Sequence, residues 1–124
     1  MSLLKAMVDD VFSRRDVSVH DVLTKHVNDT FRQRTDGLWE ERAAVVGRLE
    51  TLRDAAQSVT VSVVNELVDD RSYAERHIVT VVTRDDAMVS REVFVFGELD
   101  ETGRFLTIEE TSLPVREKRS GGAE

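Results

Sequence analysis

The 124-residue sequence predicts an α+β fold in which N-terminal helices cover one face of an antiparallel β-sheet. Up to Ala56, apolar residues recur at the three- and four-residue spacing of amphipathic helices. From Ser58 onward, apolar and polar residues alternate, and β-branched residues are frequent, as in strands. The turn-rich stretches DDRS, RDDA and DETG interrupt this alternation, so the second half predicts a meander of four strands.

Three helices are predicted in the first half of the chain. The second is short and follows Ser18, which resembles the N-cap of a weak capping box. The third is long and follows the break TDGLW, with Asp36 as its candidate N-cap, and the extended segment TFRQR precedes this break. The apolar stripes are Leu4, Met7, Val8, Val11 and Phe12 in the first helix, Val19, Val22, Leu23 and His26 in the second, and Trp39, Ala43, Val46, Leu49, Leu52 and Ala56 in the third.

Alternation with period two assigns the residues of each predicted strand to two faces of the sheet. Large apolar side chains occur on both faces, although a sheet covered by helices on one face usually has a polar second face. Because an uncovered apolar patch usually marks an interface, we expect a homodimer joined sheet to sheet. The alternative is a sheet that curls and covers itself. The expected interface consists of Val79, Val81, Phe94 and Phe96.

The composition argues against several classes of function. The net charge of −7 disfavours binding to nucleic acid or to anionic membranes, since both require a basic surface. The absence of cysteine excludes disulfides and thiolate chemistry. His20 and His26 stand six residues apart, too far to share a helical face as metal ligands, so we expect neither a metal nor a cofactor. With no signal peptide and no apolar run of membrane-spanning length, the sequence predicts a cytoplasmic protein, bacterial in style.

The order of these elements, with the stretches DTFRQRTDGLWEERAAVVGRL, YAERHIVTVV and GELDETGRFLTIEETSL, resembles the nuclear transport factor 2-like superfamily, and most closely its SnoaL-like bacterial members. The resemblance implies a cone-shaped α+β barrel, in which a curved, mostly antiparallel sheet wraps a long helix and leaves a pocket at the open end. It covers residues 1–115, and residues 116–124 are predicted to be a disordered tail. Such proteins include polyketide cyclases, steroid isomerases, epoxide hydrolases, dehydratases and non-catalytic binding modules, so the fold does not define the function.

The resemblance also suggests site residues. The base and acid positions of ketosteroid isomerases fall at Gln33 and Val95, neither of which can transfer the required proton, so that reaction is disfavoured. In epoxide hydrolases of the limonene type, an arginine lies between two carboxylates. The arginine position matches Arg76 and one carboxylate position matches Glu110, whereas the second falls at Ile78.

Adjacent strand residues face opposite ways, so only one of the carboxylates at the neighbouring positions 109 and 110 points into the fold. We expect Glu110 to be the inward one, beside Ile108 and Ser112, with Arg76 as its partner. The partner assignment leaves two interpretations open, a catalytic or ligand-orienting pair and a buried structural ion pair.

Two functions therefore remain open. In the first, the chain is a cofactor-free acid–base enzyme of the cyclase, isomerase or epoxide-hydrolase type that acts on a small apolar organic molecule, with Glu110 and Arg76 as catalytic residues. In the second, it is a non-catalytic dimeric module whose own side chains fill the pocket. An open cavity that reaches Glu110 distinguishes the first function from the second. The expected pocket residues are Gln33, Trp39, Ile78, Arg91, Val93, Val95, Ile108 and Ser112.

Overall fold

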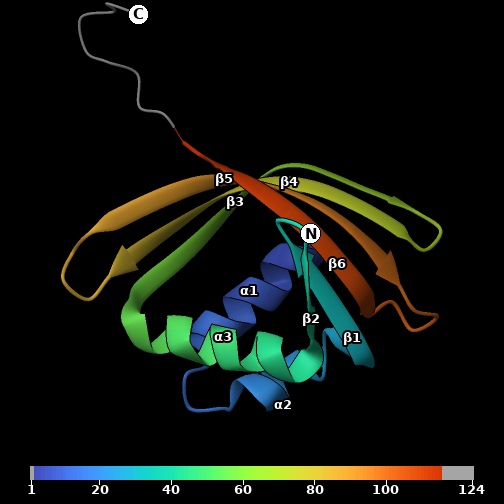
Figure 1. Cartoon of the computed structure of the whole chain (residues 1–124), viewed down its shortest axis with the longest axis horizontal. Coiled ribbons are helices and arrows are strands. Elements are labelled where there is room, and N and C mark those ends of the chain that lie inside the picture. The colour runs from blue at the N-terminus through green and yellow to red at the C-terminus, as the bar shows by residue number, and fades with distance from the viewer. Residues whose placement is uncertain (1, 116–124) are drawn as a thin grey trace, which may run out of the picture.

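In the computed structural model, which describes residues 2–115, a curved six-stranded sheet covers three helices (Figure 1). The predicted disordered tail, residues 116–124, lies outside the described residues. In chain order the elements are α1 (Leu3–Ser13), α2 (Val19–Leu23), β1 (Val27–Thr35), β2 (Leu38–Glu41), α3 (Arg42–Ala55), β3 (Ala56–Asp69), β4 (Ser72–Thr83), β5 (Met88–Leu99) and β6 (Phe105–Pro114).

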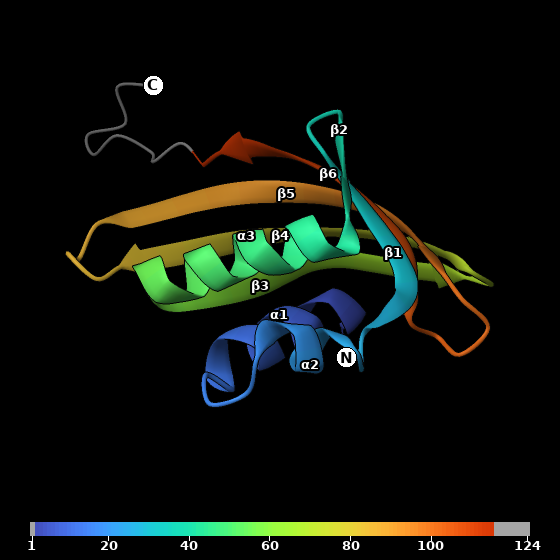
Figure 2. The same ribbon diagram turned by 60° about the horizontal axis from the view of Figure 1, so that its bottom comes forward.

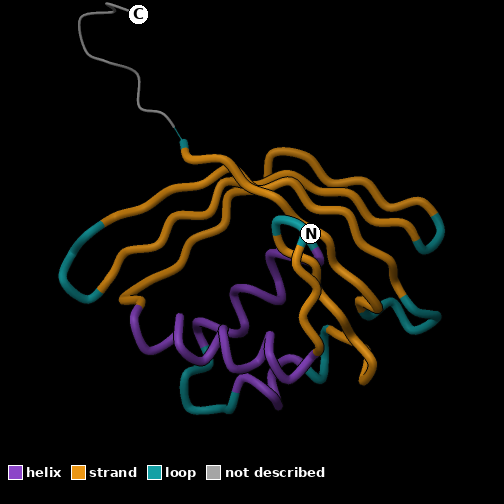
Figure 3. The backbone as a smooth tube through the Cα atoms, in the orientation of Figure 1, coloured by secondary structure: helices purple, strands orange, loops and turns teal. Residues whose placement is uncertain are grey.

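The sheet has the strand order β2-β1-β6-β5-β4-β3. β1 and β6 are parallel, and all other neighbours are antiparallel. Because α3 connects the two edge strands β2 and β3, it runs across the concave side of the sheet, as Figure 2 shows. All three helices lie on this side (Figure 3). The predicted fold class is thus confirmed, with a sheet that curves around the helices but stays open.

The first two helices form where the sequence predicts them. The Ser2 side chain caps α1 by accepting a hydrogen bond of 3.1 Å from the Lys5 amide, and Ser18 caps α2 by accepting one of 3.1 Å from the Asp21 amide. The apolar stripe of α1 is buried against the sheet and contributes to one continuous core. Within residues 2–115, no helix combines the length and the apolarity that a membrane crossing requires.

The third helix begins at Arg42 and not near Trp39, so the predicted helix start was wrong. Asp36 and Gly37 have φ angles of 49° and 91° and form the tight turn between β1 and β2. An Asp-Gly pair favours this kind of hairpin turn because both residues tolerate positive φ. Trp39 therefore lies on β2, where the guanidinium of Arg32 stacks over its ring at 4.5 Å.

One strand faces opposite to the prediction. On β4, Tyr73, Glu75 and His77 are buried against the helices, whereas Arg76 points to the outer, convex side. Tyr73 fixes this register. Its hydroxyl donates a 2.5 Å hydrogen bond to the Glu66 carboxylate, and its ring lies edge-on to another aromatic ring of the core.

This register also changes the predicted interface. Val79 and Val81 line the inner side of the sheet, so their assignment to a sheet-to-sheet interface was wrong. Phe94 and Phe96 alternate with the buried β5 residues and lie exposed on the outer side. Apolar side chains occur on both faces of β4, which is why alternation alone did not determine its orientation.

Candidate functional site

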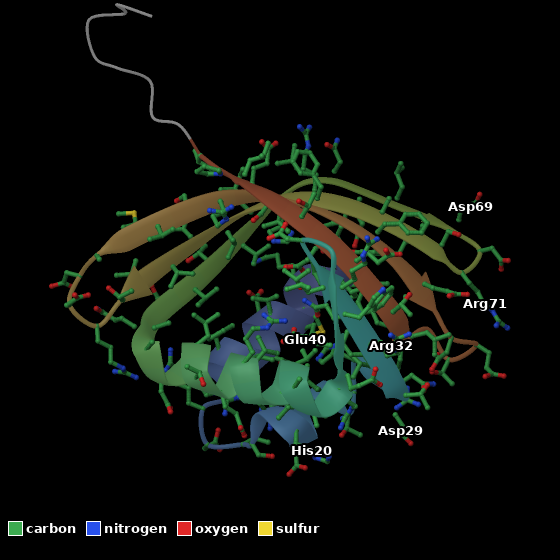
Figure 4. All side chains as sticks on the ribbon, in the orientation of Figure 1. His20, Asp29, Arg32, Glu40, Asp69 and Arg71 are labelled. Atoms are coloured by element: carbon green, nitrogen blue, oxygen red, sulfur yellow. The ribbon has the colours of Figure 1, made fainter. Side chains whose placement is uncertain are left out.

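A cavity of about 190 Å³ lies between the concave side of the sheet and the helices α1 and α3. Most of its lining is apolar. Four polar side chains, each from a different element, also line it: Gln33 of β1, Arg48 of α3, His77 of β4 and Glu110 of β6. Figure 4 shows that side chains from the sheet and the helices fill the space between the two layers, whereas the labelled Asp69 and Arg71 lie at the β3–β4 end of the sheet. An apolar cavity with a few polar groups is typical of small-molecule sites.

Glu110 points into this cavity, which is the orientation expected from the sequence. It pairs with Val95 of β5, whose side chain is buried on the same face. Its neighbour Glu109 faces outward and forms a 3.1 Å ion pair with Arg34. Alternation along β6 thus separates the two carboxylates, one in the cavity and one on the surface.

The environment of Glu110 favours its neutral form. Burial raises the pKa of the Glu110 carboxyl above its ordinary value, since an ionised group loses its hydration inside the protein. The positive charge of Arg48, and that of His77 when it is protonated, act in the opposite direction and reduce this rise. No other side chain of residues 2–115 forms a hydrogen bond with the Glu110 carboxylate. The nearby cation Arg48 forms its ion pair with Glu40 instead, at 2.9 Å. The carboxyl is therefore available to a bound molecule.

Arg76 is not the partner of Glu110, and the predicted pair was wrong. The Arg76 guanidinium lies on the outer side, where it donates hydrogen bonds of 2.9 and 2.7 Å to the Asn65 side chain and one of 3.2 Å to Glu92. The physical reason is the register of β4, which turns Arg76 away from the helices together with Ile78. Ile78 consequently does not line the cavity.

The polar residues that β4 does bring inward are Glu75 and His77. His77 Nδ1 lies 2.7 Å from Glu75 Oε1, and the two side chains are 6% and 0% exposed. The other carboxylate oxygen of Glu75 is buried and has no hydrogen-bond partner among residues 2–115. The sequence contains a signal for this pair, because residues two apart on a strand share a face. It was missed because the face was assigned to the outside.

The remaining predicted pocket residues divide into two groups. Gln33, Val93 and Ile108 line the cavity. Arg91 and Ser112 lie outside it and bond to each other, the Arg91 Nε donating to the Ser112 hydroxyl at 2.7 Å. Trp39 also lies outside it, on the surface of β2, and Val95 is buried in the core without lining the cavity. No group of three or more His, Asp or Glu side chains that could hold a metal ion is found in residues 2–115.

No protein-family model matches the sequence, and no curated protein is significantly similar to it. Solved structures do match its fold. A presumed SnoaL-like polyketide cyclase from Jannaschia sp. CCS1 superposes with a TM-score of 0.69 at 15% identity, over 89% of this chain and 82% of that one. A presumed isomerase from Rhodopseudomonas palustris gives 0.72 at 12% identity, over 90% of each chain. A nuclear transport factor 2-like protein of unknown function from Exiguobacterium sp. 255-15 gives 0.70 at 16% identity, over 94% of this chain and 100% of that one.

These matches define the class of protein at the level of fold. The chain has the cone-shaped α+β fold, with an open curved sheet around the helices and a cavity between the two layers. More particularly, this is the fold of the nuclear transport factor 2-like and SnoaL-like structures, so the fold that the resemblance implied is confirmed. Identities of this size show the fold and leave the reaction to be argued from the site.

Proposed function

We propose that the chain binds a compact, mostly apolar organic molecule in the inner cavity and that Glu110 transfers a proton to or from it. The observation that carries this proposal is a carboxyl group with a raised pKa in a mostly apolar cavity. Carboxyl groups perturbed by burial are frequent in catalytic sites, because a pKa closer to neutral allows the group both to donate and to accept a proton.

The volume of the cavity limits the size of the ligand. A dry cavity of about 150 Å³ in another protein holds benzene, and the cavity in this chain measures about 190 Å³. A molecule built on one small ring therefore fits, whereas a steroid or a polycyclic polyketide requires the cavity to expand. We expect monocyclic ketones, epoxides or similar compounds as ligands.

The chemistry of Glu110 fits the reaction types considered from the sequence. Isomerisation, aldol cyclisation and epoxide opening each require the transfer of a proton to or from an oxygen or carbon atom. A carboxyl group carries out this transfer without a cofactor. The names of the presumed cyclase and the presumed isomerase with this fold agree with such chemistry in those proteins. The competing hypothesis, a module with a self-filled pocket, predicts no cavity at Glu110, and the observed cavity weighs against it.

The test compares two neighbouring glutamates with opposite orientations. Glu110→Gln keeps the size of the side chain but cannot exchange a proton at neutral pH, so we expect ligand binding to persist and turnover to fall by about 10²–10⁴-fold. Glu109→Gln, the matched control on the outer face, is expected to change neither. Binding is measured by calorimetry with a panel of monocyclic ketones and epoxides, and turnover by product analysis of the compounds that bind. Equal turnover in both variants, or no binding by any compound of the panel, contradicts the proposal.

A further inference from the structure

We propose that His77 is a second proton-transfer group of the inner cavity and that Glu75 is the residue that positions it. This inference rests on the proposed function, because it places His77 in the same cavity as Glu110. It assigns a catalytic role to His77, which carries the proton, and a positioning role to the fully buried carboxylate of Glu75, which bonds to His77.

The hydrogen bond between the two residues determines which ring nitrogen is free. When Glu75 is ionised, its carboxylate only accepts hydrogen bonds, and His77 Nδ1 then carries the hydrogen that it donates to Glu75 Oε1, 2.7 Å away. The neutral imidazole then has an unprotonated Nε2, which can accept a proton. Among residues 2–115, Nε2 has no hydrogen-bond partner, and His77 lines the cavity. The free nitrogen is thus available to a bound molecule.

The sheet places His77 and Glu110 on opposite sides of an apolar strand. Across β5, Glu75 pairs with Val95 and Val95 with Glu110, while His77 pairs with Val93 in the next row. β4 and β6 are two strand spacings apart, about 10 Å. Val93, which lines the cavity, and the buried Val95 therefore separate the two proton-transfer groups, and a small ring packed on Val93 has a polar group on each side.

The Glu75–His77 pair is costly to the fold, which favours a functional explanation. A buried carboxylate oxygen without a hydrogen-bond partner destabilises the folded state, and an apolar residue at position 75 avoids this cost. Buried polar groups that violate packing rules are expected mainly at functional sites. The chain offers a comparison, because His26 and Asp10 also lie 2.7 Å apart but outside the cavity, with side chains 17% and 36% exposed.

Cyclohexanone is a suitable probe, since it has one small ring and one carbonyl group. In the proposed step, a proton moves from the α-carbon to His77 Nε2, and the electron pair of the broken C–H bond forms the C=C bond of the enol. Protonated Glu110 gives its proton to the carbonyl oxygen in the same step, and the π-electron pair of the C=O bond forms the new O–H bond. The proton on His77 Nε2 then exchanges with D2O, and reversal delivers a deuteron to the α-carbon, so the ketone gains deuterium, which NMR measures without any knowledge of the natural substrate.

The experiment compares the wild-type protein with Glu110→Gln, His77→Gln, Glu75→Gln and the matched control Asp10→Asn. We expect His77→Gln to slow deuterium exchange by about 10²–10⁴-fold and Glu75→Gln to slow it by at least about tenfold, because the imidazole loses its fixed orientation. Asp10→Asn should exchange at the wild-type rate. A separate readout is the ¹⁵N spectrum of His77, which should show the Nδ1–H tautomer in the wild-type protein and a mixture of tautomers in Glu75→Gln.

The possible outcomes separate this inference from the proposed function. If Glu110→Gln abolishes exchange and His77→Gln retains it, the inference is wrong and the role of Glu110 stands. If His77→Gln abolishes exchange and Glu110→Gln retains it, the role of Glu110 is wrong and His77 acts alone. Cyclohexanone that binds to the wild-type protein without exchanging contradicts both. If a melting curve shows that His77→Gln does not fold, an Nε2–H tautomer in the wild-type spectrum still overturns the inference.

Discussion

The raised pKa of Glu110 has a consequence for stability as well as for chemistry. Its pKa is raised in the folded protein, so between the unfolded and the folded pKa the folded state binds more protons than the unfolded state. Stability therefore falls as pH rises through this interval, because the buried carboxylate must ionise.

The variant Glu110→Gln removes this cost and should be more stable than the wild-type protein at neutral pH. We expect a melting temperature higher by a few degrees, equivalent to about 1 kcal/mol, and a difference that disappears below the ordinary pKa of a glutamate. Differential scanning calorimetry between pH 4 and 8 measures it. A lower melting temperature for Glu110→Gln at neutral pH contradicts this prediction and favours a structural role for the carboxylate.

Glu110 and the Glu75–His77 pair also show how much of the site can be predicted from the sequence. The inward orientation of Glu110 was predictable, because Ile108, two residues before it on β6, is buried, whereas Thr111 on the other face is exposed. The pair of Glu75 and His77 was not, because β4 carries valines or isoleucine on both faces. The orientation of β4 depends instead on the contacts of Tyr73 with the Leu4 amide and the Phe105 ring, which are distant in the sequence and which no local pattern contains.

Among the elements, the turn between β5 and β6 depends on Asp100. Its Oδ1 accepts hydrogen bonds from the amides of Thr102 and Arg104, at 2.8 and 3.1 Å, and its Oδ2 accepts one of 2.9 Å from the Asn28 side chain at the start of β1. These bonds, of which that from Asn28 has the largest effect, hold the pKa of Asp100 well below its usual range. One carboxylate thus joins the β5–β6 turn to the first strand.

A depressed pKa stabilises the folded protein above the ordinary pKa of an aspartate, and this contribution is lost as the pH falls towards the folded pKa. Asp100→Asn should therefore lower the melting temperature at pH 7, with a deficit that shrinks below about pH 4. The neighbouring exposed Glu101, changed to Gln, is the control and should have little effect at either pH. A deficit that is the same at pH 7 and pH 3 contradicts the role of the ionised carboxylate.

Most of the order of the elements was predictable, whereas the strand β2 and the exact limits of the elements were not. The four strands of the meander follow from alternation, α1 follows from apolar spacing, and α2 follows from apolar spacing and its Ser18 cap. The β1–β2 hairpin was missed, because its Asp36–Gly37 turn resembles a helix start when the following residues, from Arg42 onward, are helical. The pairing of β1 with β6 joins the two ends of the domain, and no pattern within either strand indicates it.

At the scale of the whole molecule, the outer side of the sheet leads us to expect a homodimer. Leu67, Phe94, Phe96 and Leu113 are 71%, 38%, 55% and 55% exposed on this side. The first three line a groove of about 810 Å³, and an exposed apolar surface of this kind is typical of an interface. The same side carries the ion pairs Arg34–Glu109 and Arg76–Glu92. This side therefore carries both positive and negative side chains. A second copy related by a two-fold axis presents the same set, so that opposite charges can face each other across the interface.

Sedimentation at micromolar concentration should give twice the chain mass of 14.0 kDa. Phe96→Asp places a charge in the expected interface and should give monomers. Leu3→Asp, on α1 in the helical layer, is the control and should leave the dimer intact. A wild-type protein that sediments as a monomer contradicts the dimer and leaves the inner cavity unaffected.

The central claim is that the inner cavity binds a compact molecule beside Glu110. The most direct test is a titration of the protein, ¹³C-labelled at its methyl groups, with cyclohexanone. Val93 and Ile108 line the cavity, whereas Leu67 and Leu113 lie exposed on the outer side, so their methyl signals report on the two sites separately. The claim predicts saturable shifts at Val93 and Ile108 with little change at Leu67 and Leu113. Shifts confined to the outer residues, or no shifts at Val93 and Ile108 with this ring-sized probe, contradict it.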